Sequence, residues 1–202
     1  MVERRRRGAA LEDAILDAAW AELLDHGYGG FTMEAVAKRA DTSRPVLARR
    51  WEKRSDLALA AMWNYNKNNS VDAPDLGNVR DELILLLQKF SDRSSQITFK
   101  LLIALSEYFI ETNASLSDIR KQVIGEGGLK KVLERGVARG ELDQSKMTPR
   151  ISSLPADLVR HELLMTHKPV SKELIEEIVD TIFLPLVATG LRRRDLLQRG
   201  AA

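Results

Sequence analysis

The side chains with the most distinctive chemistry are arginines and lysines, which gather at two places in the first 54 residues. Arg4–Arg7 form a run of four positive charges, and residues 38–54 hold seven basic against two acidic side chains. Between these two basic islands, residues 8–37 hold six acidic side chains and no Lys or Arg. A basic run is often only a solvated face, so the islands indicate a polyanionic partner only if the surrounding elements fit one.

Other residues that could support chemistry lack the partners that catalysis needs. His161 and His167 are six positions apart on one predicted helix and so point to different faces, whereas the zinc-protease pattern needs a spacing of four. The glycine-rich stretch 125–128 lacks both the lysine of a phosphate-binding loop and the spacing of a dinucleotide fingerprint. The absence of cysteine excludes disulfides, thiolate metal sites and a cysteine nucleophile. We therefore expect no enzyme, no metal and no cofactor.

The composition is that of an ordinary globular protein. The chain has 202 residues, enough for one domain or two small ones, with 44% hydrophobic and 30% charged residues. No apolar run approaches the roughly 18–20 residues of a membrane span, and the first residues lack an apolar signal-peptide core. We therefore expect a cytoplasmic protein with no membrane partner.

Hydrophobic residues recur at helical spacing along almost the whole chain, and no stretch shows a convincing period of two, so the predicted fold class is all-α. Thr32 is a candidate N-cap for the second helix, and Pro45 fits the first turn of the third. Pro74 and Gly77 mark a break after the fourth helix. The predicted helices span about 10–26, 33–40, 43–50, 55–69, 78–92, 95–110, 115–139, 149–167 and 172–190.

The second and third predicted helices, joined by a short turn and followed by a basic stretch, are the pattern of a helix-turn-helix DNA-binding protein. A resemblance to the TetR family of bacterial one-component repressors is carried by FTMEAVAKRADTSRPVLARRWEKRSDLALAAM (residues 31–62). The family's first helix and glycine loop are similar to AILDAAWAELLDHGYGGFT, and its regulatory domain resembles, more weakly, LERGVARGEL and IVDTIFLPLV. The resemblance implies a three-helix DNA-binding domain over residues 9–69, with its motif at about 32–51. It further implies a helical ligand-binding and dimerisation domain over residues 70–202.

The residues expected to contact DNA lie around the recognition helix. Such a helix enters the major groove by its N-terminal end, where free N–H groups favour phosphate and the first side chains reach base edges. Arg44 suits a bidentate contact with guanine, whereas Val46 either contacts a thymine methyl group or belongs to the core. Phosphate contacts are expected from Thr32, Thr42, Ser43, Lys53 and Arg54. The full predicted set is Arg6, Arg7, Thr32, Thr42, Ser43, Arg44, Pro45, Val46, Arg49, Lys53 and Arg54.

Two residues depart from the family pattern. Asp41 stands where the family usually has a turn glycine, but Asp tolerates a left-handed conformation better than most residues, so we expect the turn to survive. Ala48 stands where the family commonly has a phosphate-contacting tyrosine, so that contact is lost, and Arg49 or Arg50 is the candidate replacement. Arg50 could instead pair with Glu52 or Asp56.

The resemblance implies a DNA-binding transcriptional regulator, most simply a repressor that a small molecule releases from a palindromic operator. An activator would use the same DNA chemistry, and the alternative function is a helical ligand-binding module without DNA binding. Each ligand-lining candidate is also a candidate core residue. The candidates are Trp63, Phe90, Phe99, Tyr108, Phe109, His161 and Met165.

The last predicted helix is apolar on two neighbouring faces, one more than a surface helix needs. We expect one face to pack in the chain's own core and the other to pair with a second copy, although both faces could be buried within one subunit. Pro185 is expected to bend the helix near its end. The predicted homodimer residues are Leu158, Leu174, Ile175, Ile178, Val179, Ile182, Phe183 and Leu186.

Overall fold

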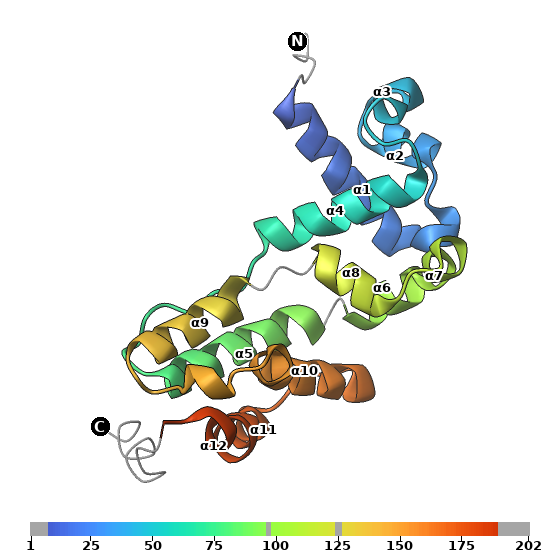
Figure 1. Cartoon of the computed structure of the whole chain (residues 1–202). Coiled ribbons are helices and arrows are strands. Elements are labelled where there is room, and N and C mark those ends of the chain that lie inside the picture. Colours follow the sequence, from blue (N-terminus) through green and yellow to red (C-terminus); the bar gives the residue numbers. More distant parts are fainter. Residues whose placement is uncertain (1–7, 96–97, 124–126, 190–202) are drawn as a thin grey trace. The chain divides into compact units, whose positions relative to one another are not determined.

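The computed structural model describes residues 8–95, 98–123 and 127–189, and within these ranges the fold is helical without strands, as predicted (Figure 1). No helix in these ranges has the length and apolarity needed to cross a bilayer. The chain divides into two units: unit 1 is Met1–Asn69 with Lys100–Gly125, and unit 2 is Ser70–Phe99 with Glu126–Ala202. The domain predicted over 70–202 stays a prediction, and by contact α7 and α8 pack with the N-terminal helices α1 and α4.

Unit 1 is built around its first helix. Its helices are α1 (Ala9–Gly30), α2 (Met33–Arg39), α3 (Arg44–Ala48), α4 (Arg54–Asn68), most of α6 (Thr98–Ala104), α7 (Ser106–Thr112) and α8 (Leu116–Val123). Helix α1 packs against α4, α2 and α7, while α2 also contacts α3 and α4 contacts α8 (Figure 1). Ile15, Leu23, Phe31, Leu47 and Met62 are fully buried in its core.

Several helices end earlier or later than the sequence pattern predicted. Helix α1 continues beyond His26 to Gly30, after a break at Gly27, whose φ of 65° places it in the left-handed region. The helix predicted over 95–110 is two helices, α6 and α7. Within the helix predicted over 115–139, the structure describes α8 and α9 (Gly127–Ala138), and residues 124–126 lie outside the described residues.

Unit 2 packs around α5 (Val79–Ser95), which contacts α9, α10 (Pro149–Thr166) and the last helical segments (Figure 1). Residues 172–187 form α11 (Lys172–Glu177), a π-helical stretch η2 (Ile178–Phe183) and α12 (Leu184–Val187). The irregularity precedes Pro185, which has no N–H to donate within the helix. In the π-helical stretch the Leu184 N–H instead donates to the carbonyl of Val179, five residues back. The bend predicted at Pro185 stays a prediction, and the observed irregularity is the wider helical turn of Ile178–Phe183 just before it.

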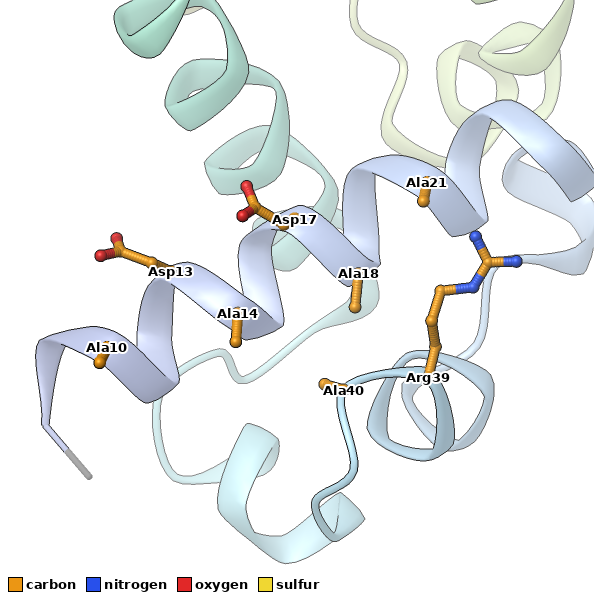
Figure 2. A pocket seen from close by; sticks show the side chains of 8 residues that line it. All are labelled: Ala10, Asp13, Ala14, Asp17, Ala18, Ala21, Arg39 and Ala40. Atoms are coloured by element: carbon orange, nitrogen blue, oxygen red, sulfur yellow. The ribbon is translucent and has the colours of Figure 1, made fainter. Parts of the chain in front are cut away.

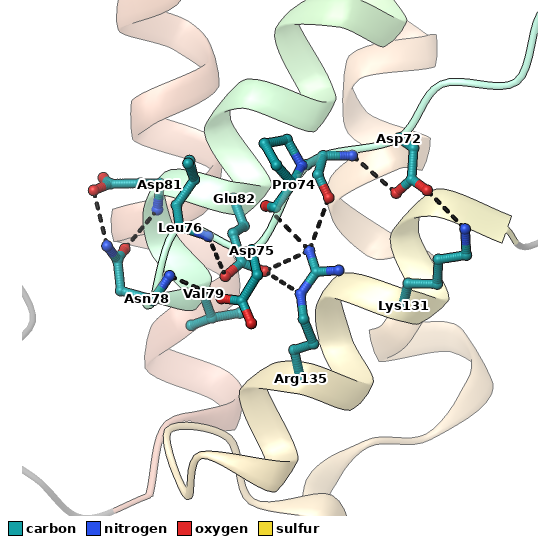
Figure 3. Close-up of polar contacts among 12 residues, drawn as sticks. Asp72, Pro74, Asp75, Leu76, Asn78, Val79, Asp81, Glu82, Lys131 and Arg135 are labelled. Carbon is teal, nitrogen blue, oxygen red and sulfur yellow. Dashed lines mark hydrogen bonds and ion pairs between the residues drawn. The ribbon is translucent and has the colours of Figure 1, made fainter.

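A polar network fixes the loop between α4 and α5 to α9 (Figure 3). Glu82 is fully buried and accepts a hydrogen bond of 2.8 Å from Arg135 Nε, while Arg135 Nη2 donates to the Ala73 carbonyl at 3.0 Å. Arg139 Nη2 also lies 2.9 Å from Glu82 Oε1, as an ion pair without hydrogen-bond geometry. Lys131 adds an ion pair of 2.7 Å to Asp72. The network thus joins residues 72–82 to α9 at several points.

Candidate nucleic-acid interface

The turn between α2 and α3 has the geometry of a Schellman motif. Thr32 caps α2 by accepting a hydrogen bond of 3.0 Å from the Ala35 N–H, which confirms the predicted N-cap. Asp41 adopts a φ of 52°, so the prediction that Asp would support a left-handed turn is also confirmed. The Thr42 N–H then donates to the Ala37 carbonyl at 2.9 Å, closing the motif. This turn fixes the point at which α3 begins.

Helix α3 has one face in the core and one face in solvent. Leu47 is fully buried and Val46 is only 9% exposed, so both belong to the core of unit 1, in which α3 packs against α2. The predicted contact between Val46 and a thymine methyl group is therefore not supported, and the core role left open by the sequence is the one observed. The exposed predicted residues of this motif are Thr32, Ser43, Arg44, Pro45, Arg49 and Lys53, and Thr42 is half-buried.

Arg44 carries its charge at the solvent-facing start of α3. Its Nε lies 2.5 Å from Oε1 of Glu34, on α2, and the two side chains are 63% and 65% exposed. An exposed ion pair of this kind contributes little stability and is screened by salt. The guanidinium can therefore exchange Glu34 for a base edge at low cost.

Arg54 has a different environment from Lys53, although both were predicted to hold phosphate. Lys53 is exposed, whereas Arg54 Nε donates to Glu111 Oε2 at 3.1 Å and Nη1 to the Tyr28 carbonyl at 3.2 Å. The guanidinium also lies 4.3 Å from the centroid of the Tyr28 ring. Arg54 is thus committed to contacts inside unit 1, which makes it a poor phosphate ligand.

The remaining basic candidates are Arg49 and Arg50, at the end of α3, and Arg6 and Arg7. Arg50 Nε lies 3.6 Å from Glu12 Oε2 on α1, so its partner is neither Glu52 nor Asp56. Arg49 is exposed at the end of α3. Arg6 and Arg7 lie outside the described residues.

The comparison with known families accounts for this arrangement. Residues 15–61 match the sequence model described as bacterial regulatory proteins, tetR family, and residues 73–182 match the one described as tetracyclin repressor-like, C-terminal domain. The chain belongs to the TetR family. It is accordingly a DNA-binding transcriptional regulator of the helix-turn-helix type, and not the ligand-binding module without DNA binding that the sequence left as an alternative.

The similarity to known proteins extends over most of the chain. The DNA-binding transcriptional repressor TetR of Mycobacteroides abscessus is 26% identical over 189 residues, covering 92% of this chain and 98% of that protein. An HTH-type transcriptional regulator of Mycobacterium tuberculosis is 26% identical over 182 residues, 86% of each chain. The crystal structure of a TetR transcriptional regulator from Agrobacterium tumefaciens has the same fold, with a TM-score of 0.62 and 21% identity over 91% of this chain and 97% of that one.

The predicted ligand-binding residues have varied environments. Tyr108 is buried in the core of unit 1, edge-on to Tyr28 at 5.1 Å, and Phe109 is half-buried beside it. Trp63, also in unit 1, is exposed beneath Lys67, 5.0 Å from its ring. In unit 2, Phe90 is half-buried, whereas His161 and Met165 are exposed. The Phe99 side chain lies outside what the structure describes.

A shallow hollow of about 660 Å³ on unit 1 contains none of these candidates (Figure 2). Alanines of α1 form its floor, and Asp13, Asp17, Arg39 and Ala40 complete the lining. Arg39 is already paired with Glu22 at 2.9 Å and with Asp25 at 2.8 Å. Small side chains thus produce the hollow, and its only cation is already paired, so it does not replace the predicted ligand site.

The predicted dimer residues separate into three groups by burial. Buried in the core of unit 2 are Ile175, Ile178, Val179 and Phe183. Their assignment to a subunit interface is not supported, because each side chain already packs within its own unit. Ile182 and Leu186, one turn apart, are 37% and 45% exposed. Leu158 and Leu174 are half-buried. The apolar surface available to a second copy is thus narrower than the sequence pattern indicated.

Proposed function

We propose that the protein is a repressor that binds a palindromic operator as a homodimer and releases it when a small molecule binds the regulatory domain. The carrying observation is the solvent-facing start of α3, where Ser43, Arg44 and Pro45 are exposed while Val46 and Leu47 anchor the helix. This presents a cation at the N-terminal end of the recognition helix, the end that enters the major groove. Such a protein works in the cytoplasm, where bacterial DNA lies.

The DNA contact is tested by fluorescence anisotropy with random-sequence duplex DNA over a range of salt concentrations. We expect affinity to fall steeply with salt, and Lys53→Ala to flatten the log–log slope by roughly 0.9 for the one lost phosphate contact. Arg150→Ala serves as the control, because Arg150 is exposed on α10 in unit 2. A slope that Arg150→Ala reduces as much as Lys53→Ala would contradict the proposed interface.

Repression and its relief are tested with a reporter gene whose promoter carries an operator obtained by selection from a random duplex library. The account expects low expression with the protein and high expression without it, and an apolar or amphipathic small molecule should restore expression. A ligand can shift DNA binding only by its differential affinity for the DNA-competent and DNA-free states. Higher expression in the presence of the protein alone would identify an activator.

A further inference from the structure

Helix α7 lies in the part of the sequence that matches the C-terminal family model, but its contacts place it in unit 1, which contains the helix-turn-helix motif. It lies within residues 73–182, which match the C-terminal family model, yet α7 packs with α1, and α8 with α4. The chain enters this segment from unit 2 after Phe99 and returns to unit 2 at Glu126. The segment that contains α7 is therefore joined to unit 2 in sequence at both of its ends.

The surface that receives α7 is the glycine loop at the end of α1. A Cβ atom added to Gly27 would lie 3.7 Å from the Ala104 backbone, and one added to Gly29 would lie 2.5 Å from the Glu107 carboxylate. The fully buried Tyr28 side chain stands between these glycines. Side chains larger than hydrogen on either side of Tyr28 would thus meet α6 or α7. At Gly27 the positive φ of 65° favours glycine, whereas a Cβ at Gly29 would displace only the flexible end of the Glu107 side chain.

Glu111 completes this contact and links three helices. Its carboxylate accepts a hydrogen bond of 2.8 Å from the Tyr28 hydroxyl of α1, and it pairs with Nε and Nη2 of Arg54, the first residue of α4. Arg54 in turn donates to the Tyr28 and Phe31 carbonyls, and Phe31 directly precedes the Thr32 cap of α2. The Glu111 carboxylate on α7 thus contacts the end of α1 and the start of α4 directly, and it reaches the residue before the α2 cap only through Arg54.

The charges in this cluster support one another. Hydrogen bonds from the Arg54 guanidinium and, to a smaller extent, from the Tyr28 hydroxyl lower the pKa of Glu111 below its usual value. Burial raises the pKa of Tyr28, and the hydrogen bond to Glu111 raises it further. The cluster therefore keeps Glu111 ionised and Tyr28 protonated at neutral pH, the states that the observed hydrogen bonds require.

We propose that Glu111 is a positioning residue for DNA binding, which acts through Arg54 and Tyr28 to couple α7 to the helix-turn-helix motif. The inference rests on the proposed function, since it names the route by which regulation reaches the DNA-binding helices. If α7 biases DNA affinity, DNA must bias α7 by the same factor, because coupling between two sites is reciprocal. The coupling can therefore be measured with DNA alone.

The experiment is hydrogen–deuterium exchange of the full chain with and without a random-sequence duplex. DNA should slow exchange in α3, and in the wild-type protein it should also slow exchange in residues 106–112 by roughly fivefold, the low end for coupled sites. In the Glu111→Gln variant, DNA should no longer slow exchange in residues 106–112 but should still slow it in α3. Glu107→Gln is the control, because it removes the same charge one turn earlier on α7 without a pair to Arg54.

Tyr28→Phe provides a second variant in case Glu111→Gln does not fold, since it removes one donor to Glu111 and keeps the ring. It should reduce the effect of DNA on residues 106–112. Protection of α3 without any protection of residues 106–112 in the wild-type protein would overturn the coupling and leave the proposed function standing. Equal loss of the effect with Glu107→Gln would overturn the role of Glu111. Absence of protection in α3 itself would instead contradict the proposed function.

Discussion

Arg44 and Lys53 are both exposed cations of the DNA-binding unit, but they occupy positions suited to different contacts. Arg44 begins the recognition helix, whereas Lys53 precedes α4. Arg44→Ala should cost about 1–3 kcal/mol on operator DNA and relax the preference at one base pair, because a bidentate contact to guanine is lost. Lys53→Ala should weaken binding to all sequences alike. Competition binding with operator variants measures the difference.

The same residues supply the control for that comparison. If Arg44→Ala weakens binding to operator and random DNA equally, Arg44 contacts phosphate and reads no base. If Lys53→Ala alters the preferred sequence, the assignment of the two roles is reversed.

The Glu111 cluster also predicts a pH dependence of stability. Because the pKa of Glu111 is lowered in the folded protein, its stabilising effect is fully present above its ordinary value of 4.5 and is lost as the pH falls below it. The difference in urea midpoint between wild type and Glu111→Gln should thus be constant from about pH 6 to 8 and shrink in acid. A difference that grew on acidification would have the wrong sign for this carboxylate.

Among the elements, the loop between α4 and α5 depends on one buried carboxylate. Glu82→Ala leaves Arg135 and Arg139 without their shared partner, and breaking such a buried pair costs about 3–5 kcal/mol. Urea unfolding should show a loss in the free energy of unfolding that is smaller than this range, because the two guanidinium groups are partly exposed and solvent screens their charges. Glu134→Ala is the control, since Glu134 is exposed on the same α9. Similar losses for both variants would show that the network does not stabilise the loop.

Element type was predictable from local sequence, whereas side-chain partners were not. The Thr32 cap and the left-handed Asp41 depend on residues within a few positions, so the sequence contains their cause. The pairing of Arg54 with Glu111 joins residues 57 positions apart. No periodicity within α4 reveals such a partner, so the sequence alone predicts a phosphate contact for Arg54.

The apolar face of the last helix shows the same limit. Periodicity identified Ile178 and Ile182 as apolar members of a helix, but only the packing of α5 and α10 decides which face is covered. Ile178 is buried and Ile182 is partly exposed. The π-helical stretch shifts the register between them, because its hydrogen bonds span five residues.

For the whole molecule, the dimer proposal now depends on the exposed residues of that segment. Ile182→Glu should give a monomer at micromolar concentration by sedimentation, because a carboxylate is costly to desolvate in an apolar interface. It should lower affinity for a full operator far more than for one half-site. Ile110→Glu is the matched control, since Ile110 is exposed in unit 1. A wild-type protein that sediments as a monomer would defeat the dimer proposal.

The central claim is that α3 reads DNA in a two-fold symmetric dimer, and operator selection from a random duplex library tests it most directly. The account predicts an enriched inverted repeat whose half-sites lie about one helical turn (~34–36 Å) or a multiple apart. Selection with Arg44→Ala should lose the preference at one position in each half-site. Enrichment of a site without two-fold symmetry, or of no sequence at all, would contradict the account.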